Sequence, residues 1–217
     1  MPYPNYTRAE RLADGVVHVV GLVAALSGVA VLFRSLAQQM GWSTFLATAL
    51  YGFTLILMLG ASAAYNMAAH TRLRPVLRRI DHAAIYVKIA GTFTPLGVLL
   101  GTMFGYVVLG LVWGLALGGA AAKLMARPGR LGSGWQTQVA LGWIGLALLV
   151  PLWGVLPGQS LWLILAGGLI YTVAVIFYCL DSLPFANAIW HVFVLVATGC
   201  FFLGISGALA AALQASG

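Results

Sequence analysis

A few polar and ionisable side chains interrupt the long apolar stretches of this 217-residue chain. Such groups are costly inside an apolar environment, so each one is a candidate functional residue. Three pairs are spaced four residues apart and a fourth is adjacent: Asp14 and His18, Ser62 and Asn66, Asn187 and His191, and Asp81 and His82. Because side chains at i and i+4 lie on one face of a helix, each spaced pair can point into the same site.

Carboxylate, imidazole, hydroxyl and amide groups that are buried together must find hydrogen-bond partners, and they would find each other. We therefore predict that the four pairs form one shared polar pocket, the kind of site that recognises a polar part of a ligand. The alternative is that each pair only caps a helix end or contacts water there, without forming a shared site. Asp14 and Asp81, for example, would be favoured near helix N-termini by the helix dipole alone.

The composition identifies the elements that must position these residues. The chain is 62% hydrophobic and only 7% charged, whereas soluble domains average about 25% charged residues. This excludes a soluble protein, and the high apolar content excludes a disordered one. The basic excess, a net charge of +7, lies in short clusters beside apolar stretches, which is typical of a membrane face. We therefore expect membrane lipids as partners and no nucleic acid.

Seven continuously apolar stretches are each long enough to cross a bilayer, which takes about 20 residues. Continuous rather than alternating apolar residues favour helices over a membrane barrel. We predict an all-α membrane protein, a single seven-helix transmembrane domain over residues 1–217. The expected spans are 15–35, 43–66, 82–101, 104–124, 138–156, 160–179 and 187–212.

The basic residues predict the orientation of the bundle. One side of the membrane would carry nine of them, and the other side only Arg34; the nine are Arg8, Arg11, Arg72, Arg74, Arg78, Arg79, Lys123, Arg127 and Arg130. Lysine and arginine are enriched on the cytoplasmic side of membrane proteins. The N-terminus is therefore expected inside and the C-terminus outside, in the cell (inner or plasma) membrane, with all four polar pairs near the cytoplasmic surface.

Three stretches of the sequence resemble the hemolysin III family, the bacterial branch of the progestin and adipoQ receptor (PAQR) group. They are SAAYN from Ser62, VLRRIDHAAIYVKIAGTFTP from Val76, and NAIWHVFVL from Asn187. The resemblance covers nearly the whole chain and includes the pattern that ends at His18. It implies seven helices with the N-terminus inside, which agrees with the count of basic residues.

The resemblance also implies a zinc hydrolase-like site. The family motif has Ser-x-x-x-His, an Asp at the start of the third helix, and His-x-x-x-His in the seventh. Ser62, Asp81 and His191 match it as candidate catalytic and metal-binding residues, but Asn66 and Asn187 stand where the motif has histidine. Asparagine is a weak zinc ligand compared with imidazole. Zinc is thus suggested as a cofactor by the family and doubted for this chain.

Lys88 is a second departure, because the family usually has an apolar residue there. It follows Asp81 by seven residues, on the same helix face and about 10.5 Å further along the axis. Helical side chains lean toward the N-terminus. We therefore predict that Lys88 pairs with Asp81 in place of a metal ion, and that Lys88→Met destabilises the protein by roughly 3–5 kcal/mol. The alternative is that Lys88 faces a wet cavity or reaches elsewhere.

Three functions remain open at this point. The first is lipid sensing or membrane homeostasis on a scaffold whose metal site is degenerate. The second is an active metal-dependent lipid amidase or esterase that uses Ser62, Asp81 and His191. The third is a pore-forming cytolysin, which the family name suggests but seven retained spans disfavour. The sequence leaves the lipid ligand, the oligomeric state and the physiological signal open.

Overall fold

The computed structural model describes residues 6–68, 71–126, 132, 134–180 and 182–216. Two of the nine basic residues used for the orientation, Arg127 and Arg130, lie outside these described residues. Within the described part of the chain every regular element is a helix. The all-α prediction is confirmed.

Seven helical segments are long and apolar enough to cross a membrane, which confirms the expected number of spans. The elements are α1 (Arg8–Leu36) with the short 3-10 helix η1 (Ala37–Gln39), α2 (Trp42–Met67), α3 (Arg74–Leu100), α4 (Met103–Leu124), α5 (Trp135–Leu146) with α6 (Leu149–Leu152), α7 (Gly158–Cys179) and α8 (Ala186–Ser216). Each expected span overlaps one of these segments.

The helix ends have local causes. The α1 helix begins earlier than its apolar stretch because Thr7 and Glu10 cap each other's backbone N–H groups, a reciprocal arrangement that stabilises a first turn. The α3 helix ends at Gly101, whose φ of 60° suits glycine. The fifth span was expected to be continuous but is divided into α5 and α6. Pro151 explains the break, because its ring would clash with the carbonyl of Ala147 in an unbroken helix.

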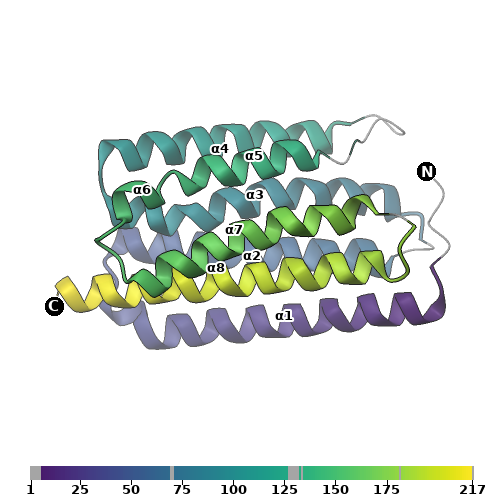
Figure 1. Cartoon of the computed structure of the whole chain (residues 1–217), viewed down its shortest axis with the longest axis horizontal. Helices are drawn as coiled ribbons and strands as arrows, with labels where there is room; N and C mark the ends of the chain where they lie inside the picture. Colours follow the sequence, from purple (N-terminus) through teal and green to yellow (C-terminus); the bar gives the residue numbers. More distant parts are fainter. Residues whose placement is uncertain (1–5, 69–70, 127–131, 133, 181, 217) are drawn as a thin grey trace.

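The α3 helix lies at the centre of the bundle. It packs against α2, α4, α5 and α8, and Figure 1 shows α3 and α7 between the outer helices α1 and α4. In α3, 67% of the most apolar window is buried, compared with 17% in α1. The residues of α3 therefore face the interior, whereas α1 presents most of its side chains to the outside.

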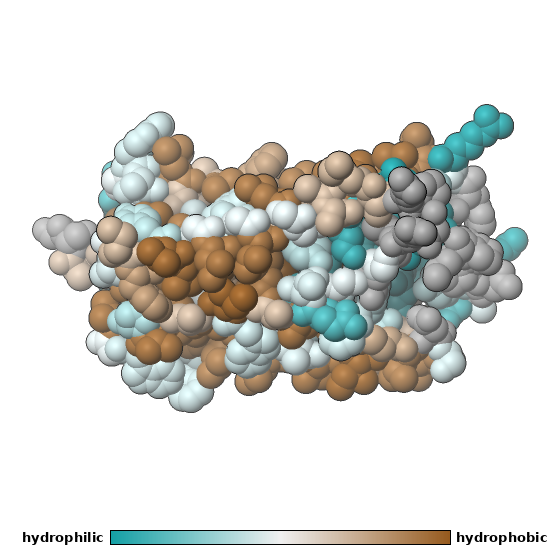
Figure 2. Space-filling view, turned by 90° about the horizontal axis from the view of Figure 1, so that it is seen from above, coloured by the Kyte–Doolittle hydropathy of each residue, from teal (hydrophilic) through white to brown (hydrophobic). Residues whose placement is uncertain are grey.

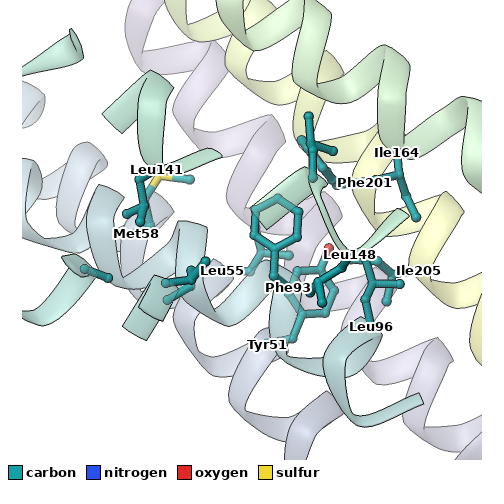
Figure 3. Packing of buried hydrophobic residues seen from close by; sticks show 14 of the residues in the cluster. Tyr51, Leu55, Met58, Phe93, Leu96, Leu141, Leu148, Ile164, Phe201 and Ile205 are labelled. Carbon is teal, nitrogen blue, oxygen red and sulfur yellow. The ribbon is translucent and has the colours of Figure 1, made fainter. Parts of the chain in front are cut away.

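The packing around α3 is apolar in the half of the bundle distant from the polar pairs. Figure 3 shows Phe93 over Tyr51, with Leu148, Ile205 and Phe201 beside them. Close contact between α2 and α3 requires Gly91, since a Cβ at this position would run into the Thr54 side chain. Small residues commonly allow such close helix contacts in membranes.

The four polar pairs lie at one end of the bundle, which we call the polar end and define by Asp14, Asn66, Asp81 and Asn187. There α1, α3 and α8 begin and α2 and α7 end, whereas α8 ends at the opposite side (Figure 1). Figure 2 shows hydrophobic side chains over the middle of the molecule and hydrophilic ones gathered toward the polar end. An odd number of crossings places the start of α1 and the end of α8 on opposite sides.

Candidate functional site

A cavity of about 660 Å³ runs into the bundle from the polar end. Its wall comes from α2, α3, α5, α7 and α8. Six of the eight paired residues line it: Ser62, Asn66, Asp81, His82, Asn187 and His191. The remaining two, Asp14 and His18, are buried behind this wall. The structure therefore brings the four pairs together at one end of the bundle, three of them on the cavity wall and the fourth behind it.

Asp14 anchors His191 from behind the cavity wall. The distance from Asp14 Oδ1 to His191 Nδ1 is 2.6 Å, the length of a charge-assisted hydrogen bond. An ionised carboxylate can only accept hydrogen bonds, so Nδ1 of His191 carries the proton and donates it. In the neutral ring, Nε2 is then an acceptor, and it lies 3.5 Å from the Ser62 hydroxyl oxygen.

His18 is oriented in the same way. Its Nδ1 lies 2.8 Å from the main-chain oxygen of Asp14 and donates to it. Its Nε2 is therefore also an acceptor, 3.2 Å from Ser62 Oγ and 3.5 Å from Asn66 Nδ2. The two imidazole rings meet edge to face with their centroids 4.3 Å apart. Two imidazole nitrogens with free lone pairs thus converge on Ser62.

The two asparagines complete this network. Asn66 Nδ2 donates to the main-chain oxygen of Ser62 at 2.9 Å, and Asn187 Nδ2 donates to Asn66 Oδ1 at 3.3 Å. The second N–H of Asn66 can serve His18, and the single Ser62 hydroxyl proton then has two acceptors facing it, His191 and Asp81. The reverse orientation of the Asn66 amide would place two oxygens together, so this assignment follows from the network.

Asp81 and His82 enter the pocket from α3, and both are buried. The Asp81 carboxyl faces the Ser62 hydroxyl and His191. Arg78, three residues earlier on the same helix face, also acts on its charge. The structure therefore brings Asp81 together with Ser62 and His191, as the family motif implies, and their catalytic roles stay a prediction.

The set of residues at the family's zinc positions does not fit a zinc ion. Asn66 directs its amide nitrogen toward His18 and its oxygen accepts from Asn187, so neither asparagine presents a free oxygen beside His191. A different group, Asp14, His18 and His191, offers three ligand atoms within 4.8 Å of one another. Bonds of about 2.0–2.1 Å in a tetrahedron require ligands about 3.3 Å apart, so these side chains would have to move closer to hold a metal.

The predicted pair between Lys88 and Asp81 is wrong. The ion pairs among the described residues join Asp14 to His18 and to His191. The Lys88 ammonium turns across the cavity instead, 3.5 Å from the Tyr171 hydroxyl and over the rings of Tyr171 and Phe201. The axial separation from Asp81 explains the error, because these aromatic faces are nearer and Asp81 has Arg78 on its own helix face.

Sequence reasoning did not find two features of the site. One is Tyr171, a hydroxyl group in the middle of an apolar span, and that position was the signal which could have identified it. The other is the contact of Asp14 with His191. The two residues are 177 positions apart, so only the fold reveals their proximity.

Comparisons with known proteins find relatives that match most of the chain. Residues 6–202 match the family model described as Haemolysin-III related. The chain is 32% identical over 199 residues to the hemolysin-3 homolog of Bacillus subtilis (strain 168), which covers 91% of this chain and 93% of that protein. It is 30% identical over 194 residues to hemolysin-3 of Bacillus cereus, covering 89% of each.

Proposed function

Because the chain belongs to the haemolysin-III related family, we propose that this multi-pass membrane protein takes a membrane lipid into its cavity and senses or maintains the lipid state of the membrane. One observation carries the proposal: a single cavity combines a hydrogen-bonding polar end with an apolar interior. The apolar part includes Ile89, Phe93, Leu146 and Phe201. An amphiphile has the same division into a polar group and an apolar chain.

The size of the cavity also supports a lipid. A volume of about 660 Å³ falls within the range of about 300–1,000 Å³ that is usual for small-molecule sites. Such sites are mostly apolar with a few placed polar groups that fix the orientation of the ligand. The hydrogen bonds around Ser62 supply those polar groups at the polar end.

A variant that fills the cavity tests the proposal. Gly142 lines the cavity, and a Cβ built there meets no atom within 4 Å. Gly142→Phe should therefore occupy the cavity without displacing packed atoms. The matched control is Gly114→Phe, at an exposed glycine of α4 that has equally open space and lies away from the cavity.

Both variants and the parent are purified from membranes, and their bound lipids are identified by mass spectrometry. The parent and Gly114→Phe should retain a lipid that Gly142→Phe loses. Equal lipid content in all three proteins would refute the proposal. Release of a dye from liposomes on addition of the purified parent would instead favour the pore-forming alternative.

A second candidate function is hydrolysis of an acyl bond in the bound lipid. The contact of His191 with the Asp14 carboxylate on one side and the Ser62 hydroxyl on the other favours it. This chain of carboxylate, imidazole and hydroxyl is the arrangement that activates a serine nucleophile. The Ser62–His191 distance of 3.5 Å is long, but such contacts are often long before substrate binds.

The steps of this candidate reaction involve only groups of the chain, the lipid and water. Ser62 Oγ attacks the acyl carbon while its proton passes to His191 Nε2. The bond to the alcohol or amine then breaks, and the leaving group takes that proton. Water adds to the acyl-serine, gives its proton to His191, and the fatty acid leaves as Ser62 recovers its proton. Asp14 holds His191 in the required tautomer throughout.

Labelling with a fluorophosphonate tests the second candidate. Ser62→Ala should abolish labelling, Asp14→Asn should slow it by about 100-fold or more, and Ser160→Ala, a buried serine at the opposite end, should leave it unchanged. Labelling that persists in Ser62→Ala would exclude the serine route. Hydrolysis of umbelliferyl palmitate that is lost on chelation and restored by zinc would assign the chemistry to Asp14, His18 and His191 as metal ligands.

A further inference from the structure

Lys88 is a buried cation without an anionic partner. Only 2% of its surface is exposed, and it lies near the middle of α3. The structure describes three of the four acidic residues, Glu10, Asp14 and Asp81, and none of them pairs with Lys88. A charged lysine buried within a membrane helix is unfavourable and usually marks a functional site.

The surroundings of Lys88 offer donors but no acceptor with a full charge. Its ammonium lies 4.6 Å from the centre of the Tyr171 ring and 5.2 Å from that of Phe201. The Tyr171 oxygen accepts one N–H at 3.5 Å, which leaves the hydroxyl proton of Tyr171 to donate. The nearby hydroxyls of Thr92 and Thr172 already donate to main-chain oxygens. Two donors, Lys88 and Tyr171, therefore face the cavity together.

We propose that Lys88 and Tyr171 form a binding site for the acid group of a single-chain amphiphile, a long-chain carboxylate held at mid-membrane depth. Both residues line the cavity, together with the apolar side chains that would contact the hydrocarbon chain. The proposal rests on the lipid-binding function above and names the class of lipid. The acid group would lie about 10.5 Å along α3 from Asp81, away from the hydrogen bonds around Ser62.

The charge balance favours a carboxylate over a phosphate. One ammonium neutralises one negative charge, whereas a phosphate monoester carries about 1.5–2 at neutral pH. Excess negative charge would remain in an apolar wall that supplies only hydroxyl groups, and an uncompensated buried charge is costly. A carboxylate has one charge and two oxygens, which the ammonium and the Tyr171 hydroxyl can serve together.

Binding of matched probes tests the assignment. Palmitate and hexadecanol share the same chain length and differ in the acid group, hexadecyl phosphate supplies the other anion, and inorganic phosphate is added as a competitor without a chain. Affinities are measured in lipid nanodiscs with radiolabelled probes. The parent should bind palmitate at least about tenfold more tightly than hexadecanol, and inorganic phosphate should not compete.

Substitutions that remove a donor at Lys88 or Tyr171 should lower the affinity for palmitate and leave the affinity for hexadecanol unchanged. Lys88→Met should weaken palmitate about 30-fold, as expected for loss of one partner of a buried charge pair, and leave hexadecanol unchanged. Lys88→Arg should retain the preference and Tyr171→Phe should reduce it several-fold. Lys123→Met is the matched control, because Lys123 is the only other lysine of the chain and lies outside the cavity.

The outcomes separate this proposal from the one on which it rests. If the parent binds neither palmitate nor hexadecanol, the lipid-binding function itself fails. If it binds both equally, or if Lys88→Met leaves the preference for palmitate intact, the acid site fails while lipid binding stands. Tighter binding of hexadecyl phosphate that depends on Lys88 would overturn the assignment to a carboxylate, and competition by inorganic phosphate would overturn the assignment to an amphiphile.

Discussion

The substitution Lys88→Met should stabilise the ligand-free protein, which reverses the effect expected from a pair with Asp81. Such a pair would have made the substitution destabilising. The structure instead shows the ammonium buried among aromatic rings, and no carboxylate of residues 6–68, 71–126, 134–180 or 182–216 forms an ion pair with it. Removing a buried charge that lacks a partner relieves its desolvation cost.

The magnitude follows from three contributions. A lysine in the middle of a membrane helix costs about 2.5–3.5 kcal/mol. The contacts of the ammonium with the Tyr171 and Phe201 rings return about 1–2 kcal/mol of this. A methionine sulfur in the same place would make its own aromatic contacts, worth about 0.3–1.5 kcal/mol. The variant should therefore be more stable by about 1–4 kcal/mol, which for a chain of this size raises Tm by about 2–16 °C.

Thermal unfolding of delipidated protein in detergent measures this effect, with Lys123→Met as the control. Lys123 donates to the Gly132 main-chain oxygen outside the cavity, so its removal should change Tm little. At the same concentration, added palmitate should raise the Tm of the parent more than that of Lys88→Met. A lower Tm for delipidated Lys88→Met would mean that the ammonium has an anionic partner within the protein, and the reasoning from burial would fail.

Three further predictions concern the rest of the bundle. Asp14→Ala should lose the hydrogen bond to His191 and lower stability by about 1.5–3 kcal/mol, whereas Asp14→Asn keeps an oxygen that can accept it and should cost less; equal losses in the two variants would contradict the role of the Asp14 oxygen as an anchor. Gly91→Leu should cost about 1–3 kcal/mol by overpacking α2 against α3, and Gly110→Leu, where a side chain meets open space, should be tolerated, so equal losses would argue against close packing at Gly91. An alkaline phosphatase fused to the C-terminus should be active, because the basic residues predict that this end lies outside; an inactive phosphatase with a fluorescent green fluorescent protein at the same position would reverse the orientation.

The number of helices could be predicted from the sequence because apolar length alone determines which segments can cross a membrane. The helix ends could not be predicted as well, because they depend on single residues. The capping pair Thr7 and Glu10 starts α1 before its apolar stretch, and Pro151 divides the fifth span. Both signals are present in the sequence, but hydrophobicity does not report them.

That the four polar pairs lie close together could also be predicted from the sequence. Spacing of four residues fixes the helix face, and the position within each apolar stretch fixes the depth. Which atoms bond to which was not predictable, because Asp14 reaches His191 across 177 positions of sequence. The direction of Lys88 was missed because it depends on Tyr171 and Phe201, which come from two later helices.

This chain departs from the family motif in two ways, with asparagines at Asn66 and Asn187 and with a lysine at Lys88. These departures have different physical consequences. Asn66 and Asn187 join the hydrogen bonds of the polar end as neutral groups and add no charge there. Lys88 adds a cation that pairs with none of the acidic residues that the structure describes. A ligand is therefore needed at the middle of the cavity more than at its polar end. Since the two places are about 10.5 Å apart along α3, an acid group held by Lys88 cannot also be the group presented to Ser62, and the proposed acid site and the hydrolytic candidate use different parts of the cavity.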